Sequence, residues 1–224
     1  DEIEIRWQTF AFSLGIHDAW LDRDRGFINP AALYVFPQDA APNEPVTLIF
    51  EAPGYEVLCA LPESDQSGAY IADSLERFLD SPAHLIGPNA RCCRFSTTVC
   101  GTAHEILITG VSSINIARLR EDFEKIFETV IRFWSPQQAL APFKRYLLSL
   151  HLAPNLYGGL EHAEGTVLLH DPKAVPAEGE ADVPKDYVDL LTLVAHEYFH
   201  AWLVKRIRPD AFVPYDLTRE AYTP

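Results

Sequence analysis

The stretch DYVDLLTLVAHEYFH, which spans Asp186–His200, predicts a helix buried in the protein core. Asp186 is of a residue type that caps helix N-termini, and Asp189 lies in the first turn, where a negative charge is favourable. Apolar side chains surround nearly the whole axis ahead of the first histidine, and a helix that is apolar on all sides is normally buried. Because the residue before a proline is disfavoured in a helix, Pro209 predicts that this helix ends by about Ile207.

The end of this stretch carries His196, Glu197 and His200, a pattern that favours a metal site. Two histidines four residues apart lie on one face of a helix, so their imidazoles can converge on one tetrahedral zinc ion. Glu197 directly follows the first histidine, and its carboxylate is placed to take a proton from a water that the metal activates. The alternative is a surface helix with incidental histidines. In an apolar helix, however, these polar groups would cost several kcal/mol without a metal.

A zinc site of this kind usually needs a third protein ligand, and the residues leave two alternatives for it. Glu220 is separated from His200 by 19 residues, a spacing that some zinc peptidases use. The other alternative is a residue beyond Pro224, in which case Glu220 is an ordinary solvated side chain.

Composition changes along the chain near residue 110. In residues 1–110, short runs of β-branched and aromatic residues bounded by turn signals predict strands, an arrangement typical of a β-sandwich. Residues 111–224 open with an expected helix over Ile116–Trp134, capped by Asn115 or Ser113, in which apolar positions recur every three or four residues. The expected strands are Val46–Phe50, Tyr55–Leu61, Arg94–Val99, Glu105–Thr109, Tyr146–Leu152, Gly158–His162 and Thr166–Leu169.

Composition and charge argue against several classes of function. The 224 residues carry a net charge of −14, so neither nucleic acid nor an anionic membrane is an expected partner. No apolar run reaches the ~20 residues of a membrane span. Four cysteines (Cys59, Cys92, Cys93 and Cys100) fit no zinc-ligand spacing. We expect them to be buried thiols in the cytoplasm, with a disulfide in a periplasmic or secreted protein as the alternative.

Segments around the two histidines resemble the M61 family of zinc metallopeptidases, the glycyl aminopeptidase family. The resemblance is carried by His196–Trp202 (HEYFHAW), Val204–Pro209 (VKRIRP), Pro214–Asp216 (PYD), Glu220–Thr223 (EAYT), Gly158–His162 (GGLEH), Asp80–Pro82 (DSP) and Gly101–Gly110. It implies an α+β fold in which an N-terminal β-sandwich, residues 1–110, precedes the first part of a thermolysin-like zinc peptidase domain, residues 111–224.

The resemblance also implies roles for individual residues. It implies that His196 and His200 bind Zn²⁺ and that Glu197 is the general base. It implies that residues 158–162 form an edge strand whose backbone pairs with the substrate, while the carboxylate of Glu161 holds the free α-amino group. The substrate-contacting residues of that strand are Gly158, Gly159, Leu160, Glu161 and His162. Taken alone, the two glycines are also typical of a turn.

Two departures from the family pattern bear on the site. The family commonly has Asn where this chain has Leu203, so we expect a hydrogen bond near the site to be missing. The resemblance implies that the family's third zinc ligand is a glutamate in a Trp-x-x-Glu-Gly segment further downstream. This chain stops before that segment. The resemblance therefore implies that Glu220 is not the ligand, that the chain is a fragment, and that residues 210–224 pack poorly.

Residues and resemblance together predict a zinc-dependent aminopeptidase that removes N-terminal residues, such as Gly and other small ones, from peptide substrates. The expected chemistry is attack by a metal-activated water, with Glu197 passing its proton to the leaving amine. One alternative is a truncated or inactive relative that binds peptides by strand addition. Another is a β-sandwich interaction protein in which the motifs are accidental. Zinc content and turnover distinguish the enzyme from the peptide-binding module.

Overall fold

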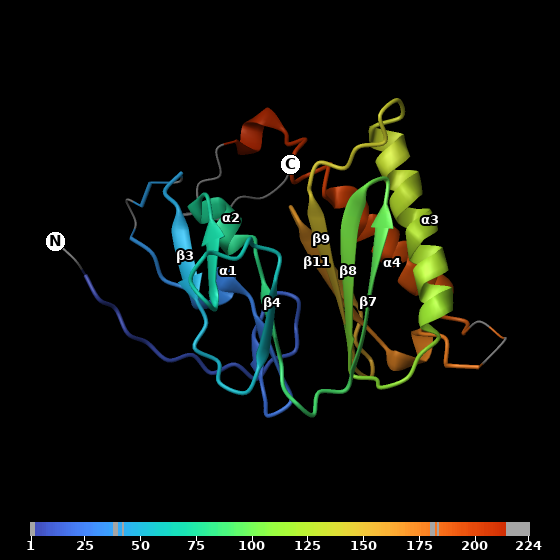
Figure 1. Ribbon diagram of the computed structural model, residues 1–224, viewed down its shortest axis with the longest axis horizontal. Helices are drawn as coiled ribbons and strands as arrows, with labels where there is room; N and C mark the ends of the chain where they lie inside the picture. The colour runs from blue at the N-terminus through green and yellow to red at the C-terminus, as the bar shows by residue number, and fades with distance from the viewer. Residues whose placement is uncertain (1–2, 38–39, 42, 180–181, 183, 214–224) are drawn as a thin grey trace.

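The computed structural model describes residues 3–37, 40–41, 43–179, 182 and 184–213, and these form three sheets and four α-helices (Figure 1). The strands are β1 (Trp20–Leu21), β2 (Arg25–Ile28), β3 (Val46–Ile49), β4 (Glu56–Cys59), β5 (Ala69–Ala72), β6 (Ala83–Ile86), β7 (Cys92–Val99), β8 (Thr102–Thr109), β9 (Arg145–Leu152), β10 (Gly158–His162) and β11 (Gly165–His170). The helices are α1 (Pro30–Leu33), α2 (Leu75–Leu79), α3 (Ile116–Trp134) and α4 (Tyr187–His200), with single 3₁₀ turns η1 (Pro172–Ala174) and η2 (Asp210–Phe212).

A five-stranded mixed sheet with the order β10-β11-β9-β8-β7 forms the middle layer of the molecule. β9 lies parallel to β8 and to β11, whereas the outer strands β7 and β10 are antiparallel to their neighbours. β9 is buried from Tyr146 to Leu152, as expected for an apolar strand covered on both faces.

The hairpin β7–β8 forms around Gly101 as expected, but it belongs to this central sheet. The sequence grouped it with the N-terminal strands because composition changes only near residue 110. The structure corrects this, since β8 pairs with β9 and its last residues, Ile106–Thr109, are buried on both faces. The change from one sheet to the next therefore falls between β6 and β7.

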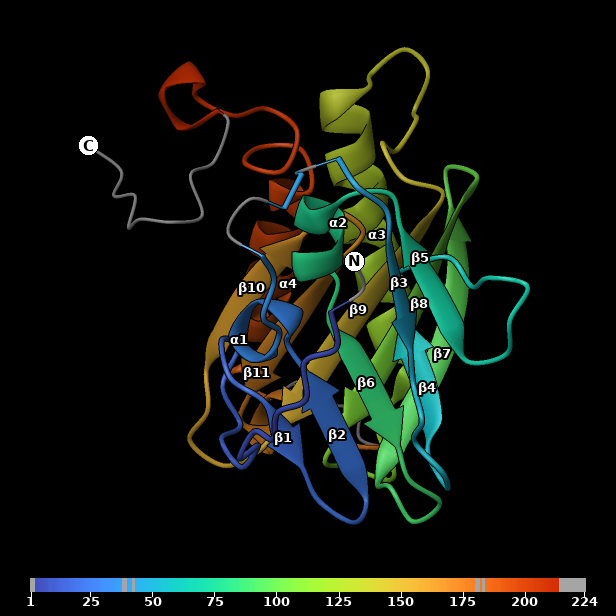
Figure 2. The same cartoon turned by 90° about the vertical axis from the view of Figure 1, so that its left-hand side faces the viewer.

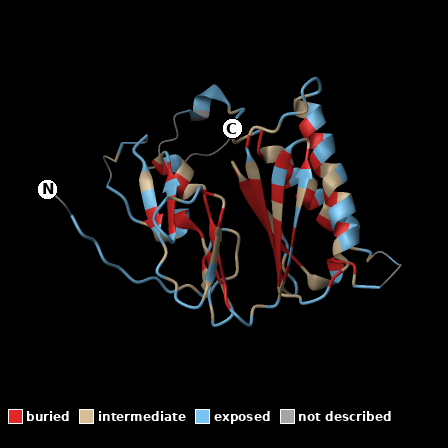
Figure 3. Cartoon of the chain, in the orientation of Figure 1, coloured by how far each residue is buried: buried red, intermediate tan, exposed pale blue. Residues whose placement is uncertain are grey.

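Helices α3 and α4 cover one face of the central sheet (Figure 1). α3 has the expected bounds, and the backbone N–H of Arg118 donates a 3.0 Å hydrogen bond to Oδ1 of its N-cap, Asn115. The side of α3 that faces the sheet is buried and the opposite side is exposed (Figure 3). Its buried residues are Leu119, Phe123, Phe127, Val130 and Ile131.

The N-terminal region, which extends to the end of β6, covers the other face of the central sheet (Figure 2). It contains a four-stranded antiparallel sheet of order β1-β2-β6-β4 and the two-stranded sheet β3-β5 (Figure 2). The rings of Phe27 on β2 and His84 on β6 lie 5.5 and 5.2 Å from the ring of His151 on β9. The expected α+β class, with the β-rich part first, is confirmed.

All four cysteines lie among the described residues, and all are free thiols. Cys59 and Cys93 are buried, and burial raises the pKa of the Cys59 thiol to about 11. None of the helices that the structure describes has the length and apolar character needed to traverse a bilayer.

Candidate active site

Helix α4 presents His196 and His200 on one face, in successive turns. Their Nε2 atoms lie 3.0 Å apart, and their ring planes are perpendicular, at 89°. Two nitrogens bound at about 2.0–2.1 Å to one tetrahedral zinc ion lie roughly 3.3 Å apart. Small movements of the two rings therefore suffice for both to share an ion. His196 is exposed and His200 is partly exposed, so the space between the rings is open to solvent.

The protonation pattern of His200 is set by the turn that follows α4. Its Nδ1 lies 3.0 Å from the carbonyl oxygen of Leu203. A carbonyl oxygen only accepts hydrogen bonds, so Nδ1 carries the hydrogen and Nε2 of the neutral ring keeps its lone pair for a metal. This contact orients His200 through the backbone of residue 203, whichever side chain stands there. The Leu203 departure therefore does not affect this particular hydrogen bond.

Helix α4 ends at His200, earlier than the limit that Pro209 sets. Beyond it, Val204 adopts a left-handed backbone conformation with φ of 96°, which is unusual for a β-branched residue. The backbone N–H of Lys205 donates a 3.2 Å hydrogen bond to the carbonyl oxygen of His200. The chain thus turns directly after the second histidine, and this turn supplies the Leu203 carbonyl.

The side chain of Glu197 extends from α4 toward β10, and only 5% of the residue's surface is exposed. Its Oε2 atom is buried and makes no hydrogen bond within the described part of the chain. Burial raises the pKa of Glu197 to about 7, the charge of Glu161 also raises it, and the charge of His200 lowers it. A carboxyl group with a pKa near neutrality is suited to take up and release a proton in the same reaction cycle.

One face of β10 looks toward α4. A Cβ atom placed on Gly159 would lie 2.2 Å from Oε1 of Glu197, so the strand backbone and this carboxyl group are in close contact. Successive residues of a strand point to opposite faces, so Glu161 projects on the same side as Gly159. The effect of Glu161 on the pKa of Glu197 agrees with this placement.

The other face of β10 looks toward the N-terminal region. A Cβ on Gly158 would meet Cδ1 of Ile16 at 3.6 Å, and Nδ1 of His162 lies 3.0 Å from Oδ1 of Asp80. Leu160 falls on this face by alternation. That the backbone of these residues pairs with a peptide substrate stays a prediction. β10 does form the expected sheet edge, because among the described residues only β11 pairs with it.

Two family models match the chain at its two ends. The model described as M61 glycyl aminopeptidase matches residues 189–224, which contain His196, Glu197 and His200. The model described as the peptidase M61 N-terminal domain matches residues 1–86. This chain belongs to the M61 peptidase family.

Solved structures resemble the M61 chain over most of its length. An aminopeptidase N family protein from Idiomarina loihiensis is 31% identical, with a TM-score of 0.83, over 96% of this chain and 36% of that protein. The chain thus spans about a third of the length of that relative. Legionella pneumophila aminopeptidase A in complex with aspartic acid is 13% identical, with a TM-score of 0.52 over 82% of this chain and 23% of that one, which shows a similar fold alone. No curated protein matches the chain.

Replacing Gly159 of the M61 protein with Ala is expected to lower kcat/KM on a peptide substrate by about 100-fold, because misplacing a reacting group by 1 Å has an effect of this size. The added methyl group would overlap Oε1 of Glu197 at 2.2 Å, so either the carboxyl group or the strand must move. Gly158→Ala is the matched control, since its Cβ would make an ordinary 3.6 Å contact with Ile16. Equal rates for the two variants would show that Glu197 and β10 are not in close contact.

Both alternatives for a third metal ligand of the M61 chain, Glu220 and a residue beyond Pro224, fall outside the residues that the structure describes. Among the described residues, no group of three or more His, Cys, Asp and Glu side chains could hold a metal ion. Glu220 belongs to residues 214–224, which are not described, so both alternatives for the third ligand remain predictions. The expected poor packing of residues 210–224 concerns mostly the same stretch.

Sequence reasoning missed the residue that anchors α4 to the sheet of the M61 chain. The Tyr198 hydroxyl lies 2.8 Å from Nε2 of His104 on β8, whose Nδ1 lies 3.0 Å from the carbonyl oxygen of Thr102. Nδ1 therefore carries the hydrogen and Nε2 accepts the tyrosine O–H. Burial lowers the pKa of His104 to about 4, so the ring is neutral. The available signal was that His104 and Tyr198 each place a polar group in an apolar segment. Buried polar groups need hydrogen-bond partners.

Proposed function

We propose that this chain carries part of the active site of a zinc-dependent aminopeptidase. One observation supports the proposal most strongly: two imidazole Nε2 atoms lie 3.0 Å apart, beside a buried carboxyl group that touches an edge strand. Family membership supports a peptidase, and the arrangement of His196, Glu197 and His200 supports a metal-dependent one.

The residues present fit a zinc ion. His196 and His200 would hold it through Nε2, because the Leu203 carbonyl leaves His200 Nε2 free to coordinate. Neutral imidazole nitrogens are ordinary zinc ligands. The unpartnered Oε2 of Glu197 is not needed as a ligand and remains available for proton transfer. The third protein ligand would come from outside the described residues.

The proposed mechanism assigns distinct tasks to the protein's own groups. Zn²⁺, when bound, supplies the Lewis acidity that polarises the scissile carbonyl and activates water at neutral pH. Glu197 takes a proton from the attacking water as the new C–O bond forms. It then delivers that proton to the leaving nitrogen as the C–N bond breaks. Its pKa near 7 favours both transfers.

Substrate recognition is proposed to take place on β10. An extended peptide can add by backbone hydrogen bonds to the edge of this strand that no described strand occupies. Glu161 then meets the α-ammonium group in a charge-assisted hydrogen bond, on the same face as Glu197. A preference for N-terminal Gly or another small residue is proposed from the family description alone.

Zinc dependence is the experiment that tests this proposal. The natural full-length protein is expected to bind about one zinc ion per chain and to hydrolyse glycyl-p-nitroanilide. A chelator should abolish hydrolysis, and zinc should restore it. His200→Ala should lose both zinc and activity. Metal analysis and the release of nitroaniline measure the two properties.

Two outcomes would contradict the aminopeptidase proposal. Hydrolysis that survives complete removal of metal would exclude zinc catalysis. Peptide binding without turnover in the zinc-loaded protein would favour the peptide-binding module. The edge of β10, which is unpaired within the described part of the chain, also supports that module.

A further inference from the structure

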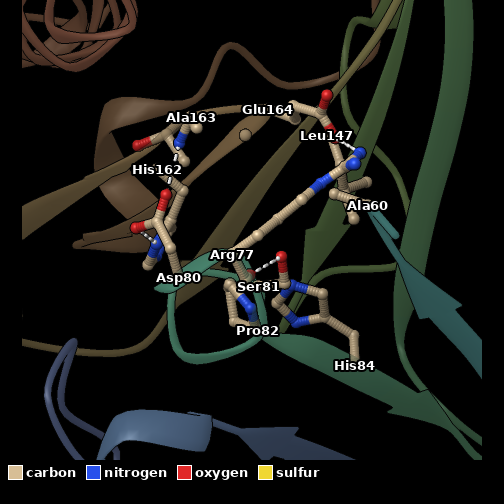
Figure 4. Close-up of a pocket in the computed structure, with 12 residues that line it drawn as sticks. Ala60, Arg77, Asp80, Ser81, Pro82, His84, Leu147, His162, Ala163 and Glu164 are labelled. Atoms are coloured by element: carbon tan, nitrogen blue, oxygen red, sulfur yellow. Dashed lines mark hydrogen bonds and ion pairs between the residues drawn. The ribbon is translucent and has the colours of Figure 1, made fainter. Parts of the chain in front are cut away.

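A partly buried carboxylate of the N-terminal region contacts the end of β10. Asp80 is the C-cap residue of α2, and 17% of its side chain is exposed. Its Oδ1 lies 3.0 Å from Nδ1 of His162, and its Oδ2 accepts a 2.8 Å hydrogen bond from the backbone N–H of Ala163 (Figure 4). Oδ1 also lies 2.8 Å from Nζ of Lys205. Both oxygens are therefore used, by donors from separate segments.

The positions of these donors link three parts of the proposed site. His162 is the last residue of β10 and directly follows Glu161. Ala163 begins the turn into β11. Lys205 lies in the turn after α4, where its backbone N–H donates to the carbonyl oxygen of His200. Asp80 thus joins the N-terminal region to the strand that carries Glu161 and to the turn that orients His200.

The charge of Asp80 is maintained by these contacts. Although burial raises the pKa of Asp80, hydrogen bonds and charges from His162 and Lys205 outweigh it and hold the pKa below its usual value. A carboxylate that is mostly shielded from solvent, with both oxygens hydrogen-bonded and a cation beside it, is a rigid attachment point.

The same turn is attached at two further points. Arg77 of α2 forms a 2.7 Å ion pair with Glu164 (Figure 4), and Nη1 of Arg206 donates a 2.9 Å hydrogen bond to the carbonyl oxygen of Ala163. Among the described strands, β10 is paired on one side only. Its end is therefore located by its pairing with β11 and by these side chains, and Asp80 contacts both the strand end and the turn after α4.

We propose that Asp80 is a positioning residue that sets where Glu161 stands relative to Glu197. This inference rests on the proposed function, because it assigns Asp80 to amine recognition by that site. Holding His162 and Ala163 fixes the adjacent Glu161 along the strand. Recognition of the substrate amine then depends on how the N-terminal region packs against the central sheet.

The test is Asp80→Asn in the natural full-length protein. Asn keeps the shape and can still accept from Ala163, but its amide N–H₂ faces the donors of His162 and Lys205. We expect kcat/KM on a free-amine substrate to fall by about 10- to 100-fold, mainly through KM. The rate on the matching N-acetylated substrate should change little. Loss of the preference for a free amine supports the positioning role.

A structural role without positioning gives a different result. Glu105→Gln is the matched control, because Glu105 pairs at 2.7 Å with Arg145, which also donates to the carbonyl oxygen of Cys59. That contact joins the N-terminal region to the same sheet on β8 and β9, away from β10. We expect this variant to lose stability and keep the preference for a free amine. An Asp80→Asn variant that behaves in the same way would overturn the proposal.

Hydrogen exchange separates a failure of this inference from a failure of the proposed function. Asp80→Asn should speed amide exchange in residues 158–166, whether or not the protein hydrolyses peptides. Unchanged exchange there would overturn the positioning role. If Asp80→Asn does not fold, Lys205→Met removes one donor and leaves the carboxylate. It should shift substrate preference and exchange in the same direction, and no shift would likewise overturn the proposal.

Discussion

Replacing Glu197 with Gln is expected to lower kcat on a peptide substrate by about 10²- to 10⁴-fold, the range for loss of a general base. Gln has nearly the same shape but cannot take a proton from water. Glu197 is not a proposed ligand, so zinc content should stay unchanged. The melting temperature should not fall, because the variant removes a carboxyl group whose charge is opposed by burial and by Glu161. Steady-state kinetics, metal analysis and thermal unfolding measure these effects.

Asp189→Asn is the matched control for Glu197→Gln. It makes the same chemical change on the same helix, at an exposed position in the first turn of α4. We expect its kcat to remain near that of the unmodified protein. If Glu197→Gln keeps most of its activity, another group must accept the proton, and the assignment of Glu197 as general base is wrong.

The helices were predictable where the signal is local. The apolar spacing over Ile116–Trp134 gave α3 its bounds, and Asn115 proved to be its cap. The start of α4 also agrees with the sequence, since Asp186 holds the N-cap position, but its side chain makes no capping hydrogen bond. The end of α4 at His200 was not predictable from Pro209. It depends on Val204 adopting a left-handed backbone conformation, which no residue preference indicates.

Sheet membership was less predictable than the strands themselves. The hairpin around Gly101 was expected, but its pairing with β9 was not. Strands Thr102–Thr109 and Arg145–Leu152 are separated by the whole of α3, and no local pattern states which strands become neighbours. β8 is buried on both faces because of the elements that surround it in the fold, which its own sequence does not specify. The prediction therefore assigned this strand by composition, to the N-terminal part.

The candidate site divides in the same way. His196, Glu197 and His200 lie within five residues of one helix, so helical geometry alone brings them together. The approach of Gly159 to Glu197 joins two elements that are far apart in the sequence. Alternation along a strand indicates that Gly159 and Glu161 share a face, but only the fold shows that this face looks toward α4.

Replacing Glu161 with Ala is expected to lower kcat/KM on substrates with a free N-terminus by about 10- to 100-fold. A hydrogen bond to a charged group contributes about 1.5–3 kcal/mol, and each 1.4 kcal/mol corresponds to tenfold. Substrate and transition state both carry the ammonium group, so kcat/KM falls chiefly through KM. Zinc content should stay unchanged, because Glu161 is not a ligand. N-acetylated peptides should be poor substrates of the unmodified protein, and the variant should cut them no more slowly.

Glu128→Ala on α3 is the control for the change in charge. Glu128 forms an exposed ion pair with Arg132 of the same helix. This variant therefore changes the net charge by the same amount as Glu161→Ala without touching β10. A general attraction of cationic substrates by the acidic protein would weaken similarly in both variants, whereas amine recognition by Glu161 predicts an effect in Glu161→Ala alone. If the unmodified protein cuts acetylated and free peptides equally well, Glu161 does not anchor the amine. The site would then be better described as that of an endopeptidase.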